Sequence, residues 1–283
     1  MAELNLLKNP ITSRQNSVVK RICALGEKKM RKAERMFRFD GIKLLLEASN
    51  KGVEIEYVVL NESIDKRNLQ RVEELVNLGL LEEKRIICVT DVVFSKMSEE
   101  SSPEGVITVA RFVANAHREI LSVDEYFLDP AKRILIVESL RDPGNMGTVI
   151  RSGFALGIDR LIISDDCADL YNSKTVRAAM GALFALEIDI VPKNELPNLI
   201  LRLRSLGRDI FATALRDDAK KIGEIDMKSG DAFVIGNEGH GLSEAVINAA
   251  SATAIIPMTD GSESLNAAAA AAICIWETVR KGR

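Results

Sequence analysis

Short polar residues and glycines gather at three places where the sequence predicts that a buried strand leads into a helix. The first, DPGNMG at residues 142–147, follows the apolar run 134–137. In an open α/β sheet, ligands bind beyond the carboxyl ends of the strands. Arg151 lies six residues beyond Asn145, about 9 Å along a helix, near the end where the helix dipole disfavours a cation. The segment therefore predicts either an anionic ligand for Asn145 and Arg151, or a Pro-Gly turn in which Asn145 caps the helix.

The second junction, GNEGHG at residues 236–241, directly follows the apolar strand residues 233–235. Three glycines in six residues allow a backbone to approach a ligand closely. Their order is not that of the dinucleotide-binding fingerprint, and no Walker A sequence occurs, which disfavours NAD and ATP. Two interpretations of Glu238 stay open: it accepts hydrogen bonds from a ligand, or it caps the next helix. His240, between two glycines, is interpreted as an exposed loop residue rather than a base.

The third junction runs from Ile256 to the segment SESLN at residues 262–266, which opens the last helix. Ser262 or Ser264 is the cap expected from residue type alone. The alanine run 267–272 leaves almost no side-chain bulk on that helix, so another backbone can approach it closely. The high helix propensity of alanine explains part of this run.

The strands that position these junctions are expected to form a parallel sheet. A continuous apolar run such as ILIV at 134–137 is typical of a strand that is covered on both faces. Further strands are expected at 160–164, 187–191, 209–214, 232–235 and 252–256. Helices are expected at 146–156, 174–179 (capped by Ser173), 195–206 and 264–280.

The N-terminal part predicts a second, smaller α/β domain over residues 1–113. Its helices are expected at 15–36, 41–51, 68–78 and 91–97, and its strands at 57–60, 85–89 and 106–110. Residues 114–130 are polar and lack a strong period, so they are expected to link this domain to the second one, residues 131–283.

Positive charge is concentrated near the N-terminus. Residues 14–43 hold ten lysines or arginines against three acids, although the whole chain carries a formal net charge of −3. Such segregation indicates a polyanion ligand, or alternatively a solvated helical face. Aromatic residues make up only 5% of the chain, so contacts with phosphates are favoured over base stacking. The RNA-binding candidates are Arg14, Lys20, Arg31, Lys32 and Arg38.

Composition excludes several classes of protein. The longest apolar run, residues 267–276, is far shorter than the roughly 20 residues of a bilayer span. The N-terminus lacks the pattern of a secretory signal, so a cytoplasmic protein is expected. Four scattered cysteines and two histidines favour neither a disulfide framework nor a metal site.

In their order along the chain, the three junctions closely resemble the three motifs of the SpoU (TrmH-like) RNA ribose 2′-O-methyltransferases of the SPOUT superfamily. This resemblance covers residues 133–283. Residues 173–181 also resemble a stretch of the family, with Ala179 where serine is common, and alanine follows Asn266 where the family often has Val-Ser-Val. Residues 11–110 are similar to the family's substrate-binding domain, which is related to small α/β ribosomal RNA-binding proteins.

The resemblance implies a C-terminal parallel-sheet domain with a deep trefoil knot and a homodimer whose methyl-donor pocket lies against the subunit interface. It also implies methyl transfer from S-adenosylmethionine to a ribose 2′-hydroxyl of RNA. The two-domain layout favours ribosomal RNA, with tRNA as the alternative. A catalytically silent RNA-binding protein of the same fold is a second alternative. A nucleotide-dependent enzyme that binds phosphate at residues 236–241 is disfavoured by the glycine order and the missing lysine.

Roles for individual residues also follow from the resemblance. Because a guanidinium has a pKa above about 12, Arg151 is expected to bind a substrate phosphate and stabilise the developing alkoxide, with proton abstraction as the alternative. The residues expected to orient the ribose, the phosphate and Arg151 are Asn145, Glu238, Ser264 and Asn266. The residues expected to hold the donor, mostly through their backbone, are Thr213, Gly236, Ile256 and Leu265.

Overall fold

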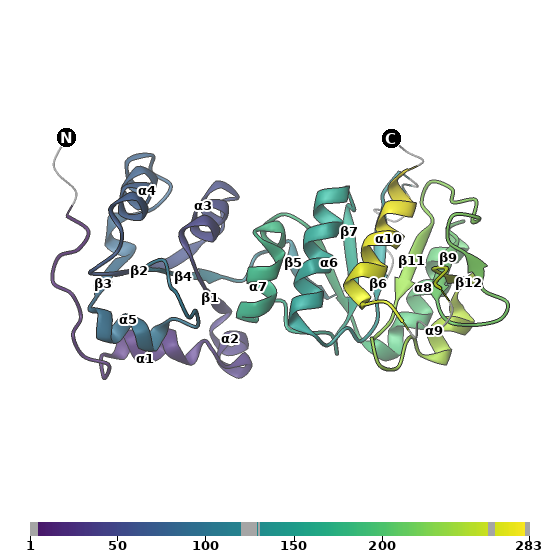
Figure 1. Cartoon of the computed structure of the whole chain (residues 1–283), viewed down its shortest axis with the longest axis horizontal. Coiled ribbons are helices and arrows are strands. Elements are labelled where there is room, and N and C mark those ends of the chain that lie inside the picture. Colours follow the sequence, from purple (N-terminus) through teal and green to yellow (C-terminus); the bar gives the residue numbers. More distant parts are fainter. Residues whose placement is uncertain (1–4, 120–128, 130, 260–263, 281–283) are drawn as a thin grey trace. The chain divides into compact units, whose positions relative to one another are not determined.

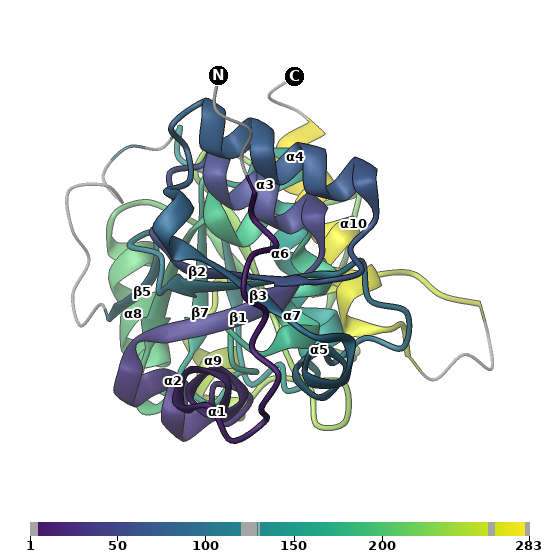
Figure 2. The same cartoon turned by 90° about the vertical axis from the view of Figure 1, so that its left-hand side faces the viewer.

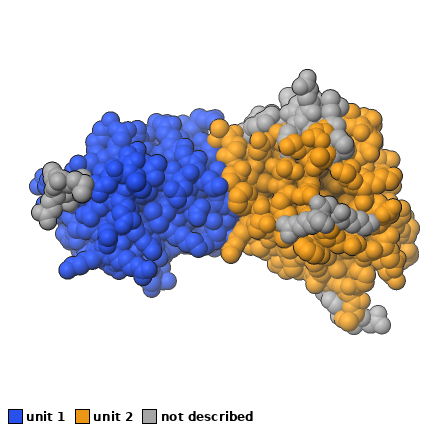
Figure 3. All heavy atoms as spheres, turned by 90° about the horizontal axis from the view of Figure 1, so that it is seen from above, with its two compact units in different colours: residues 1–113, 171–184 blue, residues 114–170, 185–283 orange. Residues whose placement is uncertain are grey.

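The chain packs into two compact units. The computed structural model describes residues 5–119, 129, 131–259 and 264–280. Unit 1 comprises residues 1–113 and 171–184, and unit 2 comprises residues 114–170 and 185–283 (Figure 3). The chain therefore leaves unit 1, forms part of unit 2, and returns to unit 1 for one short segment before it completes unit 2.

Unit 1 is a four-stranded sheet with helices on both faces. Its strands are β1 (Met36–Asp40), β2 (Ile55–Asn61), β3 (Ile86–Val89) and β4 (Val106–Arg111), in the order β1-β4-β2-β3. Its helices are α1 (Ser17–Ala24), α2 (Lys28–Glu34), α3 (Ile42–Asn50), α4 (Lys66–Asn77), α5 (Asp91–Met97) and α7 (Ser173–Ala179), with 3-10 helices at Glu83–Arg85 and Ala182–Phe184. Because side chains alternate along a strand, Val58 and Leu60 pack with α3 and α4, whereas Val59 packs with α1 and α5. Figure 2 shows these two pairs of helices on opposite faces of the sheet.

Unit 2 contains an eight-stranded sheet in which every pairing between the described strands is parallel. Its strands are β5 (Ala116–Glu119), β6 (Ile134–Val137), β7 (Arg160–Ser164), β8 (Glu187–Val191), β9 (Ile210–Thr213), β10 (Lys220–Lys221), β11 (Ala232–Ile235) and β12 (Ala252–Ile255). Its helices are α6 (Pro143–Leu156), α8 (Leu196–Ser205), α9 (Glu244–Ala249) and α10 (Ala267–Arg280), with a 3-10 helix at Lys193–Glu195. A parallel sheet of this kind, with a smaller α/β unit, confirms the expected fold class.

The order of the sheet in unit 2 decides which loops meet. The order is β10-β12-β9-β11-β6-β7-β8-β5, so β11 lies directly beside β6 although the two are far apart in sequence (Figure 1). Helices α6 and α10 pack against each other, while α8 and α9 pack over apolar residues of the strands. Since parallel strands end at the same edge, the loops after β6, β9, β11 and β12 all emerge there.

The expected helix over residues 15–36 is wrong in its extent. The chain turns between α1 and α2, Arg35 takes a left-handed conformation with φ of 51°, and β1 begins at Met36. Strand β1 pairs antiparallel with β4 and buries Phe37 and Phe39. Phe37 and Phe39 alternate with Arg38 and Asp40, which is the period of a strand. The basic residues that precede this segment led to the prediction of a helix instead.

Residues 171–184 belong to unit 1 because of an aromatic cluster. Tyr171 is buried, stacks on Phe112 with ring centroids 3.9 Å apart, and lies 4.7 Å from Phe37. Its hydroxyl accepts a hydrogen bond from the backbone N–H of Val113 at 3.1 Å. Residues 171–184 therefore pack with unit 1, and the second domain expected over residues 131–283 stays a prediction.

The expected linker, residues 114–130, is also partly structured. Residues Ala116–Glu119 form β5, which pairs with β8 at the end of the parallel sheet. Residues 120–128 and 130 lie outside the described residues. The trefoil knot stays a prediction, since residues 260–263, in the segment that leads into α10, are also outside them.

Candidate active site

One polar side chain from each of the three junctions joins a single hydrogen-bonded chain. Asn145 donates from Nδ2 to Oε1 of Glu238 at 2.5 Å, and Asn266 donates from Nδ2 to Oδ1 of Asn145 at 3.0 Å. Both ends of the Asn145 amide are used, so its orientation is fixed. The structure thus brings together three of the five residues expected at the catalytic centre.

The helices that carry these residues begin at different caps from those expected. The carboxylate of Asp142, not Asn145, caps α6 and accepts from the backbone N–H of Asn145 at 2.7 Å. Asn266 caps α10, because its Oδ1 accepts from the N–H groups of Ala268 and Ala269. Asn266 therefore caps a helix with one end of its amide and binds Asn145 with the other, whereas Ser264 lies before the helix and Ser262 is outside the described residues.

Two other caps also differ from the expected ones. Asn172, not Ser173, caps α7. Ser243, not Glu238, caps α9 and accepts from the N–H of Val246. The carboxylate of Glu238 is therefore not used as a cap and bonds to Asn145 instead.

Arg151 and Ser264 lie apart from this hydrogen-bonded chain. Arg151 is exposed on α6, and among the described residues no partner forms a hydrogen bond or ion pair with its guanidinium. Ser264 is exposed and borders the cavity described next. The guanidinium of Arg151 is therefore available to an anionic ligand.

A cavity of about 540 Å³ opens at the carboxyl edge of the sheet. Its lining includes all four residues expected to hold a methyl donor: Thr213, Gly236, Ile256 and Leu265. Ala267 and Ala270 of α10 also line it, so the alanine run leaves room beside the sheet. A volume of this size suits a nucleoside-sized ligand.

Gly236 is required by a close approach of backbone. A Cβ atom at this position would lie 2.3 Å from the carbonyl carbon of Gly241. The two chain segments are held together by Asn237 and Gly241, whose backbone groups bond to each other at 3.1 and 2.9 Å. The loop therefore folds back tightly and presents backbone to the cavity.

Sequence reasoning missed an ion pair on the cavity wall. Arg216 donates to both carboxylate oxygens of Glu244 at 2.6 Å, and both residues line the cavity. Arg216 follows β9, so its place beyond the carboxyl end of a strand was the available signal.

The two buried thiols of unit 2 are not suited to nucleophilic chemistry. Burial raises the pKa of Cys167 to about 11, and it also raises the pKa of Cys274. Since the thiolate is the reactive form, both cysteines stay inert at neutral pH.

Two of the five expected RNA-binding residues are structural. Arg31 is only 4% exposed and donates to the carbonyl oxygens of Leu25 and Gly26. Arg38 is 8% exposed, donates to the carbonyl oxygen of Met97 and forms a 2.5 Å ion pair with Glu99. These internal contacts disfavour the RNA contacts expected for Arg31 and Arg38, because positive charge does not reveal which way a side chain points. Arg14, Lys20 and Lys32 are exposed.

Neither a metal cluster nor a membrane span is found in the part of the chain that the structure describes. No group of three or more His, Cys, Asp or Glu side chains there could hold a metal ion. No described helix combines the length and the apolar character needed to cross a bilayer.

Comparison with known proteins agrees with this geometry. Residues 132–276 match the model of the SpoU rRNA Methylase family, and residues 16–108 match that of the MRM3-like substrate binding domain. The chain is 30% identical to the 23S rRNA (guanosine(2553)-2′-O)-methyltransferase RlmP of Bacillus subtilis, over 94% of this chain and 97% of that protein.

Two solved structures are similar over nearly the whole chain. One is an AdoMet-bound rRNA methyltransferase from Sinorhizobium meliloti, with a TM-score of 0.78, 28% identity and coverage of 96% and 98%. The other is the SpoU methyltransferase AviRb from Streptomyces viridochromogenes in complex with AdoMet, with a TM-score of 0.77, 25% identity and coverage of 95% and 98%. With the family model matched over half of the sequence and a 30% identical relative covered over 97% of its length, the chain belongs to the SpoU rRNA methylase family.

Proposed function

We propose that this protein transfers a methyl group from S-adenosylmethionine to a ribose 2′-hydroxyl of ribosomal RNA. The observation that carries the proposal is the hydrogen-bonded chain of Asn145, Glu238 and Asn266 at the same sheet edge as a nucleoside-sized cavity. The relatives support it, since RlmP is named a 23S rRNA 2′-O-methyltransferase and two similar structures contain AdoMet.

The cavity fits the methyl donor in size and in surface. Gly236 permits the close backbone approach that folds the loop beside the cavity, and Thr213, Ile256 and Leu265 complete a mixed polar and apolar wall. These four residues would hold the donor. The donor supplies an activated methyl group, so the protein has to place the hydroxyl in line and assist the loss of its proton.

Arg151 is the residue to which we assign charge stabilisation. Its exposed guanidinium is a poor base and a good partner for a phosphate and for the developing alkoxide. Asn145, Glu238 and Asn266 hold one another in place and orient the ribose, with Ser264 beside them at the cavity.

Unit 1 would bind the RNA. The match to a substrate-binding domain and the exposed side chains of Arg14, Lys20 and Lys32 support phosphate contacts there. Unit 2 would form a homodimer, since Phe154 on α6 and Ile273 and Trp276 on α10 are 45%, 38% and 49% exposed on two helices that pack together. A ribosomal RNA substrate supports the cytoplasmic location that we propose.

The test is methyl transfer from tritium-labelled S-adenosylmethionine to purified rRNA and tRNA in parallel. We expect label in rRNA, within a dinucleotide that resists alkaline hydrolysis because its 2′-oxygen is methylated. Label in tRNA alone would replace the proposed substrate. RNA binding without label in any RNA, by a protein that binds the donor, would favour a catalytically silent RNA-binding protein.

A further inference from the structure

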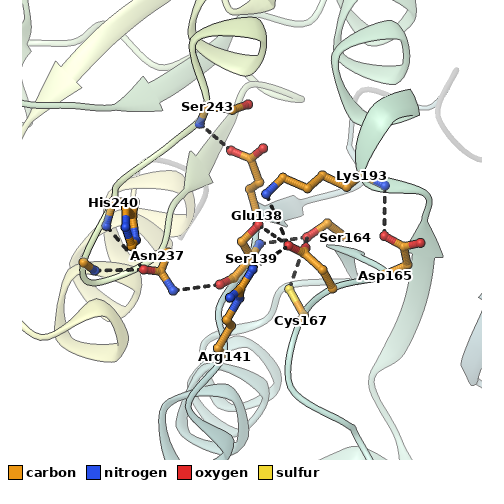
Figure 4. Close-up of polar contacts among 12 residues, drawn as sticks. Glu138, Ser139, Arg141, Ser164, Asp165, Cys167, Lys193, Asn237, His240 and Ser243 are labelled. Atoms are coloured by element: carbon orange, nitrogen blue, oxygen red, sulfur yellow. Dashed lines mark hydrogen bonds and ion pairs between the residues drawn. The ribbon is translucent and has the colours of Figure 1, made fainter.

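The loop that carries Glu238 is held at both ends by two consecutive residues after β6. At its start, Asn237 donates from Nδ2 to the carbonyl oxygen of Ser139 at 2.9 Å. At its end, the backbone N–H of Ser243 donates to Oε2 of Glu138 at 2.7 Å. Figure 4 shows both contacts. The position of the loop therefore depends on the carboxylate of Glu138 and the carbonyl group of Ser139.

Asn237 transmits that position to the rest of the loop. Its Oδ1 accepts from the N–H groups of Gly239 at 2.8 Å and His240 at 3.3 Å, so one side chain spans the turn that contains Glu238. Asn237 also lines the cavity. A shift of its anchor at Ser139 would move both Glu238 and the cavity wall.

Ser139 has a conformation that a non-glycine residue rarely adopts without support. Its φ is 57°, in the left-handed region. Its N–H donates to Oγ of Ser164 at 2.7 Å, and its own hydroxyl donates to Oδ2 of Asp166 at 2.7 Å. Ser139 and Ser164 are both buried, so these bonds are shielded from water.

The carboxylate of Asp166 is the common hydrogen-bond acceptor of the side chains around Ser139. Besides the Ser139 hydroxyl, it accepts from Oγ of Ser164 at 2.7 Å and from Nζ of Lys193 at 3.2 Å, with Arg141 at 3.5 Å. Partial burial raises the pKa of Asp166, but the bonds from Ser164, Ser139 and Lys193 outweigh it and lower the pKa to about 2. The carboxylate is therefore charged at every pH at which an RNA enzyme is assayed.

We propose that Asp166 is a positioning residue for methyl transfer: through Ser139 and Asn237 it holds the Gly236–Gly241 loop in the conformation that binds the methyl donor and presents Glu238. The inference rests on the proposed function. Asp166 does not line the cavity, so its removal should act on donor affinity through the loop.

The experiment is calorimetric titration of the full-length protein with S-adenosylhomocysteine, the demethylated donor, together with methyl-transfer kinetics. We expect Asp166→Asn to weaken donor binding about tenfold, the size expected for one hydrogen bond to a charged group. KM for the donor should rise by a similar factor. The kcat at saturating donor should change less than threefold, because bound donor selects the loop conformation that presents Glu238. Asp165→Asn is the matched control, because Asp165 is the neighbouring carboxylate and accepts instead from the N–H of Lys193.

A double-mutant cycle separates positioning from a general loss of stability. Glycine adopts positive φ readily and lacks the hydroxyl, so in the Ser139→Gly background Asp166→Asn should change donor affinity less than twofold. Equal losses in both backgrounds, or unchanged donor affinity in folded Asp166→Asn protein, would overturn the inference and leave the proposed function intact. If wild-type protein fails to bind the donor, the proposed function fails and the inference with it.

Discussion

Residue type indicated two functional regions: the carboxyl edge of the parallel sheet in unit 2 and the basic segment of unit 1. Their side chains are arranged differently in the structure. At the sheet edge, Asn145, Glu238 and Asn266 come from three distant segments and form one hydrogen-bonded chain. In the basic segment, Arg31 and Arg38 turn inward and bind backbone carbonyl groups.

This difference shows that the position of a residue in the sheet topology predicts a functional site better than its charge does. Parallel strands all end at one edge, so polar residues directly after them must come close together. A run of lysines and arginines carries no such constraint, because a long side chain can satisfy a buried carbonyl group as well as a phosphate.

The largest effect is expected from Arg151→Ala. Loss of a positioned cation should lower kcat about 10²–10³-fold, while donor affinity stays within twofold of wild type. Arg151→Lys should lie in between, since it keeps the charge but not the planar fork. Turnover of Arg151→Ala close to that of wild type would remove Arg151 from the site, and with it part of the contrast between the two regions.

The next effect is expected from Gly236→Ala. The new Cβ would lie 2.3 Å from backbone of Gly241, so the loop must open, and donor affinity should fall about 100-fold. Gly239→Ala is the matched control in the same loop, because its Cβ would meet its nearest neighbour at 3.5 Å. Calorimetry with both variants checks this, and equal affinities would contradict a tight loop as the cavity wall.

In the basic segment, Arg38→Ala should lower stability, whereas Lys32→Ala should weaken RNA binding. Arg38→Ala removes the ion pair with Glu99 and takes this donor from a buried carbonyl group, so it should lower the free energy of unfolding by about 2 kcal/mol. Lys32→Ala should change that free energy by less than about 0.5 kcal/mol but should reduce the salt dependence of RNA binding. Urea unfolding and RNA titrations at several salt concentrations measure both, and a stable Arg38→Ala protein with weakened RNA binding would reverse our assignment.

The smallest effect is expected on the stability of the protein at low pH. Asp166 has a pKa of about 2 in the folded protein against 3.8 for an unperturbed group. A carboxyl group whose pKa is lowered by folding stabilises the protein above its unfolded pKa, and this stability is lost as the pH falls through the folded value. Between pH about 4 and about 2, wild type should therefore lose on the order of 1–2 kcal/mol more than Asp166→Asn. Identical pH dependence of urea unfolding in the two proteins would show that Asp166 gives the sheet edge no electrostatic support.

Most of the fold could be predicted because its signals are local. The apolar runs of β6, β7 and β11 and the Ala-rich α10 are visible in any short window of sequence. Strand β1 was missed because its five residues continue a basic run, and only pairing with β4, about 70 residues away, makes it a strand. Residues 171–184 could not be assigned to unit 1, because the packing of Tyr171 on Phe112 is a long-range contact without a local pattern.

In the candidate site too, some residues could be predicted from local sequence and others could not. Glycines and short polar residues after strands indicated the three segments that meet at the cavity, whereas the assignment of Thr213, Gly236, Ile256 and Leu265 to the donor came from the family resemblance. Ser139 and Asp166 carry no such signal, since a left-handed serine and the carboxylate that supports it are recognisable only in three dimensions. The caps were misassigned because Asp142, Asn266 and the neighbouring serines are all good capping residues, and only geometry selects among them.

The most direct test of the central claim, that the three junctions form one methyl-transfer site, is a crystal structure of the protein with S-adenosylhomocysteine. We predict the ligand in the cavity lined by Thr213, Gly236, Ile256 and Leu265, with the chain of Asn145, Glu238 and Asn266 intact beside it. A ligand bound elsewhere, or a cavity that excludes it while the protein still methylates RNA, would contradict the account.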